Sequence, residues 1–227
     1  MDMKKILFGI FAHPDDEAFG PSGTLLSEVR AGTNVHLITL TAGEAGTNPD
    51  DVPDLAETRL AEWRAAGKLI GATSQTFFGY KDGHLDNLAM IEIAARIEAH
   101  IIATLEHYPA DTVVECMSID LNGVTGHIDH IVAGRATCLA FYRLKARGVA
   151  MKQLRLACLK DTPENTQWLY MEAGRRNDEI GMTVDNREYA ATIRAIIAAH
   201  HSQRHDGEAH IRQRGDTLGV DYFIVKT

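Results

Sequence analysis

The chain has 227 residues, a formal net charge of −8 and 45% hydrophobic residues, which is enough to build one sizeable core. The acidic balance argues against nucleic acid as a partner, because neutralising phosphates requires clustered lysine and arginine. No apolar run approaches the roughly 18 residues that cross a membrane, so no membrane span is expected.

Apolar runs alternate with segments of helical periodicity along most of the chain. The expected strands are 4–12, 34–41, 74–78 and 111–116, and the expected helices are 17–31, 55–70, 87–107 and 127–147. The later part is less regular, with LRLACLK, a helix over 187–201 and the terminal DYFIVKT. The alternation predicts an α/β fold, a mostly parallel sheet with helices on both faces, and a single domain over 1–227.

The start of the chain and its cysteines predict a cytoplasmic location. The run MDMKKILFGIF leads directly into HPDDE without a small-residue cleavage site, which indicates a first strand and not a signal peptide. The three cysteines are odd in number, far apart and without a CxxC pair, so we expect reduced thiols. The apolar later helices, such as ATIRAIIAAH, leave room for a homo-oligomer.

Three polar stretches follow expected strands. They are HPDDE after the first strand, the loop AGEAGTNPDDVPD after the second, and GHIDH after the fourth. In open α/β sheets, sites form outside the carboxyl ends of the strands. The three stretches are therefore expected to meet in one site.

The HPDD turn and the HIDH segment carry residues suited to a metal site. His13 and Asp16 lie three apart on a tight turn that Pro14 helps to set, and they supply an imidazole and a carboxylate. His127 and His130 are candidates for the third ligand, because they share a helix face. A divalent transition metal such as Zn²⁺ takes such ligands.

The neighbouring residues suit water attack on an amide. Asp15 is expected to point away from its neighbour Asp16 and to accept a proton from the attacking water. His127 could stabilise an oxyanion or protonate a leaving amine, with Asp129 near enough to orient or charge it.

Five motifs, taken in their order along the chain, give a specific family resemblance. AHPDDEAFGPSGTLL, LITLTAGEAGT, ETRLAEWRAAGKLIGA, FFGYKDGHLD and TGHIDHIVAG, in that order, resemble the PIG-L / LmbE-like zinc-dependent de-N-acetylase family. The matching blocks cover residue 6 to about residue 140. The resemblance implies a Rossmann-like fold and the removal of acetyl groups from N-acetylglucosamine-containing small molecules and their conjugates.

Carried over by position, the resemblance also implies a role for each site residue. It gives one zinc per chain, with Fe²⁺ as an alternative by availability. The implied metal ligands are His13, Asp16 and His130; the implied catalytic residues are Asp15 as base, His127 as oxyanion or acid histidine and Asp129 as its partner; the implied substrate-binding residues are Arg59, Asp82 and Glu44.

Two positions depart from the family pattern, and one later histidine matches it. Ile128 stands where many relatives have proline, and Thr125 stands where some sugar-thiol precursor deacetylases have a tyrosine. These departures bear on which subfamily the chain resembles. They bear less on the reaction, because the three polar positions of HIDH are intact. His200, in AAHHSQ, aligns with the family's HxSQ element and is expected to approach the pocket or a subunit contact.

The sequence is also compatible with simpler interpretations of these residues and with two other functions. Asp15 and Asp16 could only cap a helix, and Glu17 is better explained as a first-turn helix carboxylate than as a ligand. A metal-dependent phosphoesterase would need carboxylates for two ions, and the clusters supply three convincing ligands. A non-catalytic zinc- or sugar-binding relative would need neither Asp15 nor His127.

Overall fold

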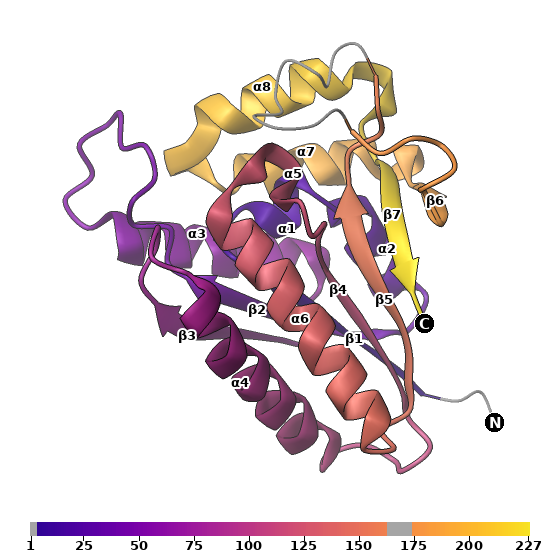
Figure 1. The fold of residues 1–227 in the computed structure, drawn as a ribbon. Helices are drawn as coiled ribbons and strands as arrows, with labels where there is room; N and C mark the ends of the chain where they lie inside the picture. Colours follow the sequence, from indigo (N-terminus) through magenta and orange to yellow (C-terminus); the bar gives the residue numbers. More distant parts are fainter. Residues whose placement is uncertain (1–3, 163–173) are drawn as a thin grey trace.

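In the computed structural model, which describes residues 4–162 and 174–227, seven strands form one sheet in the order β3-β2-β1-β4-β5-β7-β6 (Figure 1). Strands β1 to β5 pair in parallel, and β7 runs antiparallel to both β5 and β6. The strands are β1 (Lys5–Phe11), β2 (Asn34–Thr41), β3 (Ser74–Tyr80), β4 (Val113–Ile119), β5 (Met151–Cys158), β6 (Met182–Asp185) and β7 (Val220–Lys226). The predicted mostly parallel sheet is confirmed.

Helices cover both faces of the sheet, as the sequence predicts (Figure 1). Helices α4 and α6 pack on one face, and α2, α3 and α7 pack on the other. The helices are α1 (Asp16–Phe19), α2 (Ser22–Arg30), α3 (Leu55–Ile70), α4 (Asn87–Leu105), α5 (Gly123–Gly126), α6 (Ile128–Ala146), α7 (Ala190–Ala198) and α8 (Arg204–Arg214). The result is a single α/β domain with a Rossmann-like arrangement.

The central strands explain where a site can form. Strand β1 is buried over Ile6–Phe11 and β4 over Val114–Ile119, because parallel strands covered on both faces are apolar throughout. The chain passes from β1 outward to β2 and β3, and then returns to place β4 on the other side of β1. The order of the strands therefore reverses between β1 and β4, which is the point where open α/β sheets bind ligands.

The first predicted helix is wrong as one element. The segment 17–31 divides into α1 and α2, with Gly20 and Pro21 between them. Pro21 has no backbone N–H to continue a helix, and the amide of Gly20 closes α1 on the carbonyl of Asp16. Because of the break, α1 is a short helix that follows the end of β1 and contains Asp16 and Glu17.

The less regular last part of the chain completes the sheet and its second face. LRLACLK contributes to β5 and DYFIVKT to β7. The apolar side chains of α7, among them Ile193, Ile196 and Ile197, lie in the core of the chain itself. That apolar face is thus used within the chain, and a homo-oligomer stays a prediction. Among the described residues, no helix combines the length and apolarity needed to cross a bilayer.

The free energy of unfolding should fall between pH 7 and pH 5 because of His36. This side chain is 5% exposed and contacts the hydroxyls of Ser74 and Tyr108. Burial, and then the charge of His100, lower the pKa of His36 from 6.5 to about 4. The unfolded chain therefore binds a proton more readily, so this contribution is present above pH 6.5 and is lost as the pH falls towards 4.

From those two values the loss between pH 7 and pH 5 is about 2 kcal/mol. Urea unfolding at the two pH values measures it, with the variant His36→Leu as the control that lacks the titrating group. The variant should show a shallower pH dependence than the wild type. Equal pH dependence in both proteins would contradict the assignment.

Candidate active site

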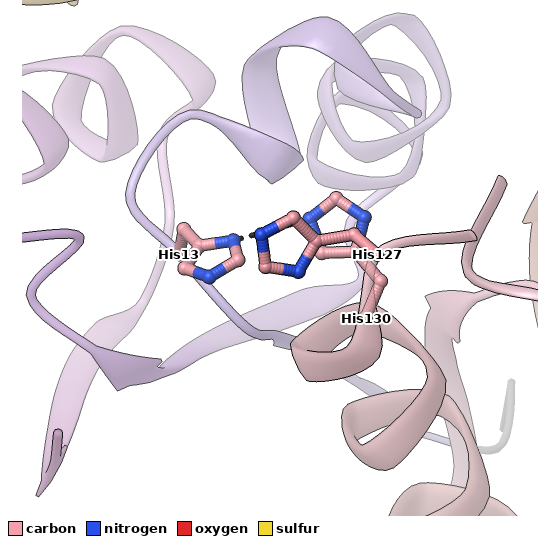
Figure 2. Close-up of side chains that lie close together, drawn as sticks. All are labelled: His13, His127 and His130. Atoms are coloured by element: carbon pink, nitrogen blue, oxygen red, sulfur yellow. Dashed lines mark hydrogen bonds between the residues drawn. The ribbon is translucent and has the colours of Figure 1, made fainter. Parts of the chain in front are cut away.

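The predicted polar stretches meet at the carboxyl ends of the central strands. His13, Asp15 and Asp16 follow β1, while His127, Asp129 and His130 lie where α5 leads into α6, after β4. Figure 2 shows the rings of His13, His127 and His130 gathered together, although His13 lies more than a hundred residues before the other two in the chain. The topology of the sheet brings them to the same edge.

The three predicted metal ligands converge. His13 Nδ1 lies 3.1 Å from His130 Nε2, which lies 3.0 Å from Asp16 Oδ1, and His13 Nδ1 lies 3.7 Å from Asp16 Oδ2. Three ligands around one tetrahedral zinc ion, each about 2.1 Å from it, are about 3.4 Å apart. The contacts of Asp16 with the two histidines use different carboxylate oxygens, so the match to this spacing is approximate, while the chemistry of the donor set suits a zinc ion.

Asp16 is held as a carboxylate by its own turn. Its Oδ2 accepts the backbone amides of Ala12 and His13 at 3.0 and 2.9 Å. Burial raises the pKa of Asp16, but the charge of His130 and its hydrogen bond outweigh burial and hold that pKa well below its usual range. The ionised form, which metal binding by this carboxylate would require, is thus the stable one.

His13 is oriented by carboxylates on its other side. Its Nε2 lies 3.0 Å from Asp82 Oδ1 and 3.4 Å from Asp129 Oδ2. Burial lowers the pKa of His13, but the hydrogen bonds to Asp129 and Asp82 outweigh burial and raise it to about 10. Such carboxylate partners fix the ring of a metal-binding histidine.

Two overlapping groups offer other combinations of donor atoms. His13, His127 and His130 have ligand atoms within 4.8 Å of one another, as do His13, Asp82 and Asp129. The carboxylates of the second group also accept backbone amides: Asp82 that of Ala45, and Asp129 those of Gly83 and Leu85. These hydrogen bonds fix the two carboxylates to the surrounding loops. Asp82 and Asp129 therefore occupy the position of residues that orient a metal ligand.

Asp15 lies beside these donors and is held by Arg59. Its φ of 105° is a left-handed conformation that residues other than glycine rarely adopt. Arg59 Nη2 lies 2.9 Å from Asp15 Oδ2. Burial raises the pKa of Asp15 to about 6, with the charge of Arg59 acting in the opposite direction. Strained residues of this kind cluster at active sites.

The three predicted substrate-binding residues all lie at this edge. Arg59 is 4% exposed and also donates to the carbonyls of Pro14 and Gly43, at 2.7 and 2.5 Å. Glu44 is exposed and accepts the amide of Asp82 at 2.9 Å. All three support the site internally, and their contacts with a substrate stay predictions.

His127 is an exposed histidine at the start of α6. Its Nδ1 accepts the backbone amide of Asp129 at 3.2 Å, and burial together with the charges of His130 and His13 lowers its pKa. In the neutral ring, Nε2 therefore carries the proton. The hydrogen bond between Asp129 and His127 uses the backbone amide of Asp129. The Asp129 carboxylate accepts the amides of Gly83 and Leu85 and faces His13.

Glu17 lies in the first turn of α1, as predicted, but sequence reasoning missed its buried partner. This carboxylate is 0% exposed, as is His200, and His200 Nε2 lies 2.8 Å from Glu17 Oε1. The AAHHSQ element was the signal that pointed towards His200, but nothing in the sequence paired it with Glu17.

A cavity of about 250 Å³ adjoins the predicted metal ligands Asp16 and His130. Thr125 lies on its wall, with apolar side chains from several elements. These apolar residues include Phe19, Pro21, Ile119, Val124, Ala157 and Leu159. The cavity therefore offers an apolar surface directly beside the polar cluster.

Comparison with known proteins assigns the family. Residues 8–141 match the family PIG-L, described as GlcNAc-PI de-N-acetylase. This match covers more than half of the chain. The chain belongs to the PIG-L family. The match contains HPDD, Arg59 and HIDH, whereas His200 and much of the cavity wall lie outside it.

The relatives of this PIG-L family chain that are matched by sequence include deacetylases of an acetamido sugar linked to inositol. The 1D-myo-inositol 2-acetamido-2-deoxy-alpha-D-glucopyranoside deacetylase of Salinispora arenicola is 30% identical over 164 residues, 62% of this chain and 52% of the relative. The chain thus spans about half the length of that relative.

Two solved structures share the fold over nearly the whole chain. The 4-carboxy-2-hydroxymuconate hydratase GalB of Pseudomonas putida has a TM-score of 0.69 and 19% identity, covering 99% of this chain and 97% of the other. The N,N'-diacetylchitobiose deacetylase of Pyrococcus horikoshii has a TM-score of 0.67 and 17% identity, covering 99% and 84%. Similarity at such low sequence identity shows a shared fold only. It does not distinguish a deacetylase from a hydratase.

Proposed function

We propose that the chain is a zinc-dependent hydrolase that removes the acetyl group from an N-acetylglucosamine-type amino sugar or its conjugate. The observation that carries the proposal is the convergence of His13, Asp16 and His130 beside Asp15 and His127. Membership of the PIG-L family and the deacetylase relatives support the choice of an amide over the double bond that a hydratase uses.

A bound zinc ion would supply positive charge that lowers the pKa of a water and polarises a carbonyl oxygen. His13, Asp16 and His130 would hold it, while Asp82 and Asp129 fix the ring of His13. The chain's own chemistry then concerns Asp15 and His127.

Asp15 is the base in this proposal. Its carboxylate contacts Arg59 and is free of the metal-ligand set, so it can accept a proton from the attacking water. The neutral His127 directs Nε2–H at the oxygen that becomes negative when water adds to the amide carbonyl. The C–N bond then breaks, the amine takes the proton that came from water, and acetate is the second product.

The test is acetate release by zinc-loaded protein from N-acetylglucosamine and from its methyl glycoside, together with metal content per chain. We expect acetate in amounts equal to the free amine formed, and about one zinc per chain. Two metal ions per chain would favour a phosphoesterase. No acetate and no bound zinc would overturn the proposal.

The adjoining cavity predicts a preference for an apolar group on the sugar. A phenyl group there would be removed from water against Phe19, Ile119 and Val124. We therefore expect kcat/KM for the phenyl glycoside of N-acetylglucosamine to exceed that for the methyl glycoside by about 10- to 100-fold.

The matched variant fills the cavity. Ala157 lies on its wall and is 8% exposed. In Ala157→Phe the ratio of the two kcat/KM values should fall to about one, since the added ring occupies the space. Equal values for the two glycosides in the wild type would contradict this use of the cavity while leaving the deacetylation itself intact.

A further inference from the structure

Glu17 and His200 form a buried pair in the layer beneath the site. Glu17 belongs to α1, and His200 follows the end of α7. Both side chains are 0% exposed. Burying two ionisable groups costs free energy, so such a pair is weak evidence for stability and calls for another explanation.

The second oxygen of Glu17 connects the pair to the proposed base. Glu17 Oε2 accepts the backbone amide of Asp15 at 3.1 Å, while Glu17 Oε1 contacts His200. Both carboxylate oxygens are therefore engaged, and neither belongs to a group that could hold a metal among the described residues. His200 Nδ1 is buried and has no hydrogen-bond partner among residues 4–162 and 174–227.

The backbone of Asp15 needs such support. A non-glycine residue at a φ of 105° is strained, and it persists only when its surroundings hold it there. The amides of Ala18 and Phe19 donate to the Asp15 carbonyl at 2.9 and 2.8 Å, and Arg59 holds the carboxylate. The amide of Asp15 is held by Glu17.

We propose that Glu17 and His200 are positioning residues that fix the backbone of Asp15 so that its carboxylate faces the reacting water. The catalytic consequence rests on the proposed function, but the structural one does not. The inference also gives the C-terminal part of the chain, which lies outside the family match, a defined part in the site.

Three variants test the proposal. Glu17→Met has a similar shape but accepts no hydrogen bond, and Glu17→Met/His200→Leu replaces the whole pair by apolar side chains. The matched control is Glu115→Met, because Glu115 is also 0% exposed and pairs with Arg155 at 3.0 Å, but has no contact with the site. The readouts are amide exchange of Asp15 by NMR, zinc content, Tm, kcat and KM.

In Glu17→Met we expect the Asp15 amide to exchange at least about tenfold faster, because the acceptor is gone. We expect kcat to fall by about 100-fold, with zinc retained and KM within about twofold, since a displaced base costs rate more than binding. The double variant should recover Tm, as apolar replacements of buried pairs often do, but it should keep the low kcat. Glu115→Met should keep both kcat and Asp15 exchange, whatever its Tm.

Recovery of kcat together with Tm in the double variant would overturn the proposal, because the pair would then be structural only. So would unchanged Asp15 exchange, or loss of zinc, in that variant. The double variant decides the matter even if Glu17→Met does not fold. Absence of acetate release by the wild type would refute the proposed function, whereas the exchange measurement would still decide the role of the pair.

Discussion

Replacing Asp15 by asparagine should lower kcat by about 1,000-fold while the protein keeps one zinc per chain. Asparagine has nearly the same shape and still offers Arg59 an oxygen, so the turn should persist. It cannot accept a proton from water at neutral pH. Because the donors that converge come from His13, Asp16 and His130, metal content should not depend on Asp15.

Steady-state acetate release and metal analysis of the same preparations check this result. The control is Asp54→Asn, which makes the same chemical change at the start of α3, where Asp54 accepts the amide of Glu57. Asparagine caps helices as well as aspartate does, so the control should keep kcat. A rate within about tenfold of the wild type in Asp15→Asn would show that Asp15 is not the base.

Replacing His130, the proposed third metal ligand, should abolish both metal binding and activity. His130→Gln is expected to reduce zinc from about one per chain to below about a tenth, and to lower kcat by at least 1,000-fold, because two remaining donors bind zinc poorly. His130 Nε2 is the atom that contacts both His13 and Asp16, so its loss opens the donor set.

His127→Gln is the matched comparison, because its ring lies only 4.8 Å from that of His130, between ring centroids. It should keep zinc, and so should His127→Leu, which carries no hydrogen-bond donor and should lose about 100-fold in kcat, the size of effect that one oxyanion donor has. Equilibrium dialysis against zinc, followed by metal analysis and acetate release, separates the two variants. Loss of zinc from His127→Gln with retention in His130→Gln would assign the third ligand to His127.

The fold could largely be predicted from periodicity. Apolar runs such as ILFGIF and NVHLITLT indicated strands, because parallel strands covered on both faces exclude polar residues. The division of 17–31 into α1 and α2 was missed, although Gly20 and Pro21 are visible in the sequence. Helical periodicity continues through them, so the pattern of apolar residues hid the break that Pro21 and Gly20 make.

The site was partly predictable for a similar reason. His13, Asp15 and Asp16 are neighbours in the chain, so their proximity needed no tertiary information. Arg59 contacts Asp15, which is 44 residues away in the chain. Glu17 contacts His200, which is 183 residues away. Nothing in a single sequence encodes such pairs directly.

The sequence by itself determined the kinds of chemical group and the edge of the sheet at which they gather, because the short turns follow from local pattern and parallel strands end at the same edge. The tertiary structure alone decided which atom of each group meets which partner. It turned His13 Nε2 towards Asp82 and Asp129, gave Arg59 to Asp15, and buried Glu17 against His200. Those choices depend on how helices and loops distant in the chain pack over one another, and side-chain geometry at that scale is fixed only once the whole core is assembled.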